Sequence, residues 1–283
     1  MAASVEALAA RVESIEDLET DLLLEGVFRR FGHDFRGYRR AALQRKLHVL
    51  MQRLGVQTVS ALQERVMHEE GAADSLLREL SARSAGLLDD PGYLHALRAA
   101  LVPLLRSCAS PRIWIAECLS AEDACALSVL LADEDLLEKT QIFATAENES
   151  LLQEASSGRF AINHLEEYAE SYRKSGGKSD LRGYCREEDG QAVFSDTLRS
   201  NITWAQYSLA TNASFNEFQL IICRQALADF GTMLRRRALQ LFYDSMPLFG
   251  ILSVDADGGL DAAHLTSRYK AIAPEQGLYR REV

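Results

Sequence analysis

The spacing of apolar residues changes at Pro111, and this change constrains the fold more than any other feature. Before Pro111, apolar residues recur every three or four positions, which is the period of one helix face. After it, short runs rich in β-branched and aromatic residues alternate with helical stretches. We therefore expect a helical domain followed by a parallel sheet that helices cover on both faces.

The helical half extends from Ser4 to about Leu105, and we place its domain at residues 1–106. Two further helices are expected at 66–83 and 91–106, and Pro91 suits a first helical turn. The apolar stripe of the first helix comprises Leu8, Val12, Ile15, Leu18 and Leu22, and that of the second Leu43, Leu47, Leu50, Met51 and Leu54.

The second domain is expected to span residues 107–283 and to be doubly wound. Its expected strands are 113–115, 142–144, 202–204, 220–222 and 251–254, and its expected helices are 123–131, about 151–155 and 232–246. Sheets of this kind bind ligands at the carboxyl ends of their strands. The polar stretch at about 168–200 interrupts the pattern, and we expect a small inserted lobe or a flexible excursion there.

Composition excludes several classes of protein. A net charge of −10 argues against general nucleic-acid binding. No apolar run approaches the roughly 18 residues of a membrane span, and the acidic N-terminus is unlike a secretory signal. The five cysteines have no CxxC spacing and the histidines are scattered, so we expect no disulfide framework, no metal site and a cytoplasmic location.

Several motifs, in order along the chain, resemble those of the chemotaxis receptor methyltransferases, the CheR family. The stretch 32–38, GHDFRGY, leads into LQRKL at 43–47, like the family's opening signature. Residues 112–116, 142–145 and 218–224 resemble its strands. The resemblance implies an N-terminal all-α domain, then a Rossmann-like domain that binds S-adenosylmethionine and methylates protein glutamates.

The residues that would hold the methyl donor depart from the family pattern. The loop after the first strand reads AECLSAED instead of AGCSTGEE, so Glu117 replaces a glycine near the donor's carboxylate. Two like charges about 4 Å apart repel by roughly 4 kcal/mol at an effective dielectric constant near 20. The acid that would accept the ribose hydroxyls is replaced by Ala146, and Glu147 is displaced by one position.

Other positions of the family's chemistry also differ. Ser208 replaces an asparagine, Gln225 the asparagine after the CR pair, and Asp229 a tyrosine. Asp89 aligns with the arginine that approaches the substrate glutamate, and it would repel a carboxylate. Residues 254–257 occupy the place of a final GHSE motif.

These departures lead us to predict that the protein is a pseudo-enzyme, which binds other proteins and needs no cofactor. Its vestigial pocket would comprise Glu117, Ala121, Glu122, Ala146, Glu147, Ser208, Arg224 and Gln225. The alternative is an active S-adenosylmethionine-dependent glutamate methyltransferase, in which Glu122 or Glu147 and Arg224 take over cofactor contacts. A third possibility is that the pocket binds another small molecule. Glu122 and Asp123 also suit the first turn of a helix.

Residues 28–61 carry eight cations and one acid, a local charge of +7. Arg39, Lys46 and Arg53 recur every seven residues and are expected to share one helix face. The resemblance implies that this helix binds an acidic partner such as a chemoreceptor; alternatives are a solvated face or salt bridges to the acidic first helix. We expect replacement of these three by glutamate to weaken partner capture without affecting folding. The candidate partner-binding residues are Arg36, Arg39, Arg40, Arg45, Lys46 and Arg53.

Overall fold

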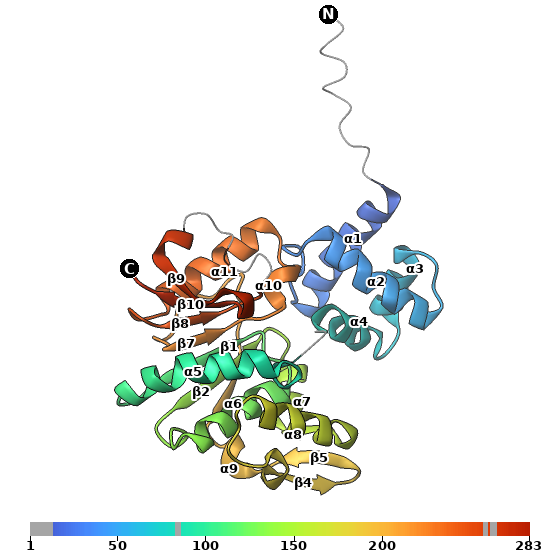
Figure 1. Ribbon diagram of the computed structural model, residues 1–283. Helices are drawn as coiled ribbons and strands as arrows, with labels where there is room; N and C mark the ends of the chain where they lie inside the picture. Colours follow the sequence, from blue (N-terminus) through green and yellow to red (C-terminus); the bar gives the residue numbers. More distant parts are fainter. Residues whose placement is uncertain (1–13, 83–85, 257–259, 261–264) are drawn as a thin grey trace, which may run out of the picture. The chain divides into compact units, whose positions relative to one another are not determined.

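The computed structural model describes residues 14–82, 86–256, 260 and 265–283, and the chain divides into two compact units, Met1–Ala82 and Arg83–Val283 (Figure 1). The division lies earlier than the boundary expected at residue 106. The reason is that helix α5 (Pro91–Ser107) buries Leu97 and Leu101 in the core of the second unit.

The described part of the first unit consists of four helices: α1 (Ile15–Phe31), α2 (Arg40–Leu54), α3 (Val59–His68) and α4 (Ala72–Ser81). Ser14 caps α1 and Thr58 caps α3, each by accepting a backbone N–H with its hydroxyl oxygen. Their core is built from leucine and valine side chains, among them Leu23, Leu50, Leu62 and Leu76.

The expected core stripe of the first helix is wrong where the structure describes it. Ile15, Leu18 and Leu22 are exposed by 79%, 51% and 53%. The buried face of α1 lies instead along Thr20, Leu23, Leu24 and Val27. Leu8 and Val12 fall outside the described residues.

A seven-stranded sheet forms the centre of the second unit, in the order β6-β2-β1-β7-β8-β10-β9. All strands are parallel except β10, which pairs antiparallel with β8 and β9. The strands are β1 (Arg112–Ala116), β2 (Gln141–Ala146), β6 (Ile202–Gln206), β7 (Leu220–Ile222), β8 (Ile251–Ser253), β9 (Tyr269–Ala273) and β10 (Leu278–Arg281). The five predicted strands are confirmed, whereas β9 and β10 were not predicted.

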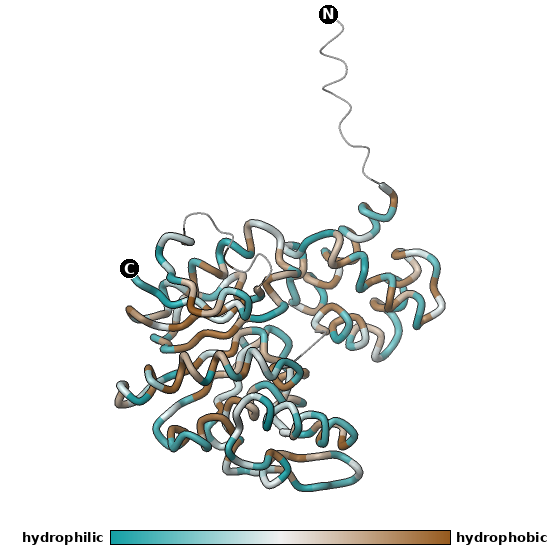
Figure 2. The backbone as a smooth tube through the Cα atoms, in the orientation of Figure 1, coloured by the Kyte–Doolittle hydropathy of each residue, from teal (hydrophilic) through white to brown (hydrophobic). Residues whose placement is uncertain are grey.

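Helices cover both faces of this sheet, as expected for a doubly wound fold. Ile113 and Ile115 of β1 share a core cluster with residues of α5 and of α6 (Ala121–Asp133). Trp114, between them, points to the other face, where its ring lies 5.4 Å from that of Phe242 on α11 (Thr232–Asp244). Strands β7 and β8 are fully buried, and apart from Ser253 their residues are apolar (Figure 2). The other α-helices that the structure describes in this unit are α7 (Glu149–Ser156), α8 (Leu165–Lys174), α9 (Asp196–Arg199) and α10 (Ala226–Asp229).

A small inserted lobe follows α7, as the sequence predicted, but it begins earlier in the chain. It contains an antiparallel sheet of β3 (Arg159–Ala161), β5 (Gln191–Phe194) and β4 (Cys185–Glu188), in that order. Asp189 and Gly190 both have positive φ, which suits the tight turn between β4 and β5.

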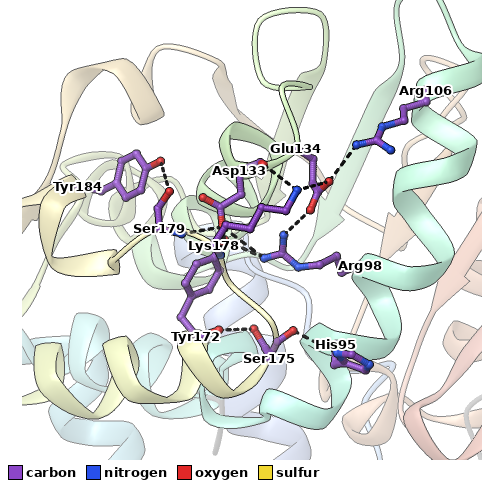
Figure 3. A network of polar contacts seen from close by, with 10 residues as sticks. All are labelled: His95, Arg98, Arg106, Asp133, Glu134, Tyr172, Ser175, Lys178, Ser179 and Tyr184. Atoms are coloured by element: carbon purple, nitrogen blue, oxygen red, sulfur yellow. Dashed lines mark hydrogen bonds and ion pairs between the residues drawn. The ribbon is translucent and has the colours of Figure 1, made fainter.

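One buried carboxylate joins this lobe to the helices beneath it (Figure 3). The Asp133 side chain at the end of α6 is fully buried. Its Oδ2 atom accepts hydrogen bonds from the hydroxyl of Tyr172 at 2.6 Å and from the N–H of Lys178 at 2.8 Å. Arg98 of α5 lies 3.6 Å from the same oxygen and pairs with Glu134 at 2.8 Å. The loop around Lys178 therefore uses its backbone amides to bind an anion that the chain itself supplies.

Replacing Asp133 by alanine is expected to lower the free energy of unfolding by about 3–5 kcal/mol, because the Tyr172 hydroxyl and the Lys178 N–H lose their buried acceptor and Arg98 loses one of two carboxylates. Urea denaturation measures this loss, and hydrogen exchange of residues 175–194 should accelerate. The exposed Glu138, replaced by alanine, is the control. A loss below about 1 kcal/mol would contradict a central role for Asp133.

Candidate functional site

The carboxyl ends of four neighbouring parallel strands form the candidate site. Ala116 of β1 is in register with Thr145 of β2, and Ile222 of β7 with Ser253 of β8. The segments that follow these strands therefore emerge at one edge of the sheet, where doubly wound folds bind ligands. This edge brings together Glu117, Glu147, Arg224, Gln225 and Asp255, of which the first four were predicted.

Two residues at this edge have backbone conformations that favour glycine. Glu117 after β1 has φ +57°, and Gln225 after β7 has φ +64°. A side chain in this left-handed region costs roughly 1–2 kcal/mol. The N–H of Gln225 donates to Oδ1 of Asp255 at 2.6 Å, and the N–H of Cys118 donates to the carbonyl of Thr145 at 2.9 Å. The turn after β1 thus keeps a backbone path suited to glycine while it carries a carboxylate.

Carboxylates of this site also fix the segment that begins α5. The 3₁₀ turn Leu87–Asp89 is held by two hydrogen bonds in which side-chain carboxylates accept backbone N–H groups. Asp89 Oδ2 accepts the N–H of Gly86 at 2.6 Å, and Asp123 Oδ1 accepts that of Leu87 at 2.5 Å. Asp90 then caps α5, because its Oδ1 accepts the N–H of Tyr93 at 2.9 Å. Asp89, predicted at the family's arginine position, is thus exposed but bound to its own backbone.

The first turn of α6 contains the predicted acidic pair, but neither acid is the cap. Ser120 caps the helix by accepting the N–H of Asp123 at 3.1 Å, and its hydroxyl donates to Glu122 at 3.1 Å. Burial raises the pKa of Asp123 to about 7. Burial also raises the pKa of the Cys118 thiol well above its usual range, so this cysteine is a poor nucleophile.

Arg224, predicted to contact a cofactor, is held by the chain itself. Its guanidinium lies 3.9 Å from the centre of the Tyr93 ring, and Nη2 lies 3.5 Å from Oδ2 of Asp90. The Tyr93 hydroxyl is within hydrogen-bond distance, 2.8 Å, of Ser253 Oγ, and burial raises the pKa of Tyr93 to about 12. Tyr93 and Ser253 were missed, because a tyrosine and a serine in apolar stretches resemble ordinary core residues.

Ala146, which we predicted to replace the ribose-binding acid, ends β2. Ala146 is buried and its carbonyl accepts the N–H of Tyr207 at 3.0 Å. The carbonyl of Glu147 accepts Nε2 of Gln206 at 2.9 Å, and its side chain is half-buried. Of the other predicted positions, Ser208 is half-buried, and Ala121 and Asp229 are buried. Residue 257 lies outside the described residues.

The predicted basic face of α2 is only partly exposed. Lys46 is buried, and its Nζ donates to the carbonyl oxygens of Leu80 at 2.8 Å and Ala82 at 3.1 Å. It therefore caps the end of α4, and the expectation that it shares an exposed face with Arg39 and Arg53 is wrong.

Several of the other cations form salt bridges, one of the alternatives left open by the sequence. Arg40 pairs with Asp17 and Asp21 of α1, and Arg36 pairs with Glu25 of α1 at 2.9 Å. Further contacts are Arg36 with Asp34, Arg36 over the Phe28 ring, and Arg53 with Glu79. Arg39 and Arg45 remain exposed.

Within the described ranges, no cluster of three or more His, Cys, Asp or Glu side chains is arranged to hold a metal ion. Likewise, no helix there combines the length and apolar character needed to cross a membrane. All five cysteines are free thiols.

Lys46→Glu is expected to lower the free energy of unfolding by about 3 kcal/mol or more, because it buries a carboxylate against two carbonyl oxygens. Arg39→Glu, at an exposed position, should leave stability within about 0.5 kcal/mol. Urea denaturation measures the free energy of unfolding of both variants. Equal stability of the two would show that Lys46 is not buried as described.

The pKa of Asp123 makes stability depend on pH. The folded state keeps a proton that the unfolded state releases above about pH 4, so stability falls as the pH rises to about 7 and is level above it. Asp123→Asn keeps an acceptor for Leu87 and removes the titration. We expect it to flatten the profile and to raise stability at pH 8 by up to about 4 kcal/mol. Urea denaturation at pH 5, 6, 7 and 8 tests this, and an unchanged slope would contradict it.

Comparisons with known proteins agree with this architecture. Residues 85–267 match the family model of the CheR methyltransferase SAM binding domain, and residues 18–81 match that of the CheR methyltransferase all-alpha domain. The putative methyltransferase Cher3 of Pseudomonas putida is 36% identical over 94% of this chain and 97% of its own length.

More distant relatives carry a name that refers to chemotaxis. A chemotaxis protein methyltransferase of Listeria innocua is 22% identical, over 85% of this chain and 90% of its own length. Chemotaxis protein methyltransferase 1 of Pseudomonas aeruginosa is also 22% identical, over 83% and 87% respectively. The chain belongs to the CheR methyltransferase family.

Proposed function

We propose that this CheR-family chain works by binding a protein partner and does not transfer methyl groups. The observation that supports the proposal is the buried methyl group of Ala146 at the end of β2, at the position that we align with the family's ribose-binding acid. A methyl group accepts no hydrogen bond, so two ribose hydroxyls would lose their acceptor on entering the site. Each unpaired polar group costs about 1–3 kcal/mol.

The charge at the neighbouring strand supports the same conclusion. Glu117 is half-buried, and in the alignment with the family it brings a carboxylate near the place of the donor's own carboxylate. Arg224 is the cation best placed to offset this repulsion, but it pairs with Asp90 and stacks on Tyr93. Moving Arg224 to a ligand would leave Asp90 without this ion pair. Repulsion and lost contacts therefore act together against the donor.

The substrate side of the site is also acidic. In the family an arginine approaches the glutamate that is methylated, and Asp89 stands at that position here. Its carboxylate binds the N–H of Gly86 and would repel a second carboxylate. A glutamate substrate would therefore meet a like charge where the family offers a guanidinium fork.

An active methyltransferase with altered cofactor contacts is the second candidate, and the backbone favours it. Glu117 and Gln225 keep left-handed conformations at the ends of β1 and β7, so a cradle with a glycine-like path is present. Glu122 or Glu147 would then accept the ribose hydroxyls, and Arg224 would contact the donor. The relative with 36% identity bears the name putative methyltransferase.

The partner that we propose is a protein with an acidic surface, and a chemoreceptor is one candidate. Arg39, just before α2, and Arg45, on α2, are exposed, whereas Lys46 is buried. Exposed charges of this kind mainly change the association rate and its salt dependence. Five free thiols suit a reducing compartment, so we propose a cytoplasmic location.

Titration calorimetry with S-adenosylmethionine and S-adenosylhomocysteine tests the proposal. We expect no heat of binding and no thermal shift, although a ligand at one hundred times its dissociation constant would stabilise the fold by about 2.7 kcal/mol. Incorporation of labelled methyl groups into a partner protein should stay at background. Micromolar binding together with methyl incorporation would establish the active alternative.

A matched set of variants tests the two proposed causes of lost donor binding, the carboxylate of Glu117 and the missing acceptor at Ala146. Glu117→Gly removes the carboxylate and suits φ +57°, and Ala146→Asp supplies the missing acceptor. The double variant should gain measurable binding of S-adenosylhomocysteine if these two positions cause the loss. Glu138→Gly, at an exposed position before β2, is the control. Circular dichroism confirms that each variant is folded.

A further inference from the structure

Helix α11 carries three consecutive arginines, Arg235, Arg236 and Arg237, in a chain whose net charge is −10. The helix contains a single acid, Asp244 at its last position, and the carboxylate of Asp244 accepts a hydrogen bond from Nε2 of Gln240 at 2.9 Å. Neither Arg235 nor Arg236 forms an ion pair with any residue that the structure describes. The positive charge of these two side chains is therefore free to act on a partner.

The exposed face of α11 combines two of the arginines with an apolar side chain. Met233, Arg236 and Arg237 lie three and four residues apart, the spacing of one helix face. Met233 is 79% exposed, and both arginines are exposed. The buried face includes Phe242, whose ring contacts that of Trp114 on β1. We call Met233, Arg236 and Arg237 the arginine face of α11.

This face lies at the same edge of the sheet as the candidate site. Helix α11 connects the parallel strands β7 and β8, so it begins at their carboxyl ends. Arg237 Nε donates to the carbonyl of Leu209 at 3.2 Å, and its Nη2 donates to that of Asn212 at 3.1 Å. The loop that carries these carbonyls starts at Tyr207, whose N–H donates to the carbonyl of Ala146 at the end of β2. Arg237 thus fixes the arginine face beside the strand ends.

The chemistry of the arginine face fits an acidic segment of a protein. A guanidinium pairs with a carboxylate through two parallel hydrogen bonds, and a flexible methionine adapts to an apolar side chain. An amphipathic helix with acids on either side of an apolar residue offers both contacts. A nucleic acid fits less well, because its continuous phosphates would extend from this small face toward the carboxylates of Glu117 and Glu147.

We propose that the arginine face of α11 is a docking surface for an acidic amphipathic segment of the partner protein. This inference rests on the proposed function, since it gives the acidic partner a second surface, in the unit that contains the candidate site. Glu117 and Glu147 repel carboxylates at the strand ends, so the segment lies along α11 and does not enter the site. The surface needs no methyl donor and therefore suits a chain that works by binding.

Fluorescence anisotropy of the full chain with a labelled helical peptide of repeated Glu-Ala-Ala-Leu units tests this surface. We expect binding at about 20 mM salt that weakens toward about 150 mM, because salt screens exposed charges. Arg236→Glu should raise the dissociation constant at least about tenfold. Lys270→Glu, the same change of charge at an exposed position on β9, is the control and should change it less than about twofold. Circular dichroism confirms that both variants are folded.

A variant without a change of charge separates docking from general attraction between opposite charges. Met233→Ser removes the apolar contact and keeps all three arginines. We expect it to raise the dissociation constant about threefold, because a docked segment also contacts the apolar side chain. An affinity equal to that of the wild type would contradict docking on this face.

Three further results would overturn the proposal. In the first, Arg236→Glu binds the peptide as tightly as Lys270→Glu does. In the second, the loss follows Arg39→Glu instead, which would keep the acidic partner of the proposed function but place it on the first unit. In the third, a single-stranded DNA of equal charge binds more tightly than the peptide, which would assign the face to nucleic acid. The donor titration tests methyl transfer independently of all three.

Discussion

Burial of β1 on both faces is the constraint on which the second unit depends. Ile113 and Ile115 pack against α5 and α6, and Trp114 packs against α11. Such a strand must lie in the middle of a covered sheet, with parallel neighbours whose connections are helices. The in-register pairing with β2 and β7 then brings the ends of the strands to one edge. The position of the candidate site follows from the burial of a single strand.

At that edge the chain uses its own carboxylates as structural acceptors. Asp89, Asp90 and Asp123 each accept a backbone N–H in the segment that begins α5, and Asp255 accepts that of Gln225. An acid that accepts a backbone N–H has less acceptor capacity left for a ligand. The acidic character of the site is therefore largely explained by folding, and the question of methyl transfer depends on Glu117 and Ala146.

Much of the second unit could be predicted because its strands are short, apolar and separated by helical stretches. Strands β9 and β10 were missed because Lys270, Arg280 and Arg281 interrupt them and leave no long apolar run in the sequence. The predicted site residues Glu117, Glu147, Arg224 and Gln225 do follow neighbouring strands. Tyr93 and Ser253 could not be predicted, since their contact joins residues 160 positions apart.

The sequence by itself determined the family, the order of the two kinds of structure and which residues stand in the stretches that resemble the family's motifs. Periodicity and motif order are properties of neighbouring residues, and a chain expresses them before it folds. The tertiary structure decided which side chains are available. Lys46 is hidden against α4, Arg40 is paired with α1, and Arg224 rests on Tyr93. These contacts join segments distant along the chain, and burial and pairing exist only once the chain has folded.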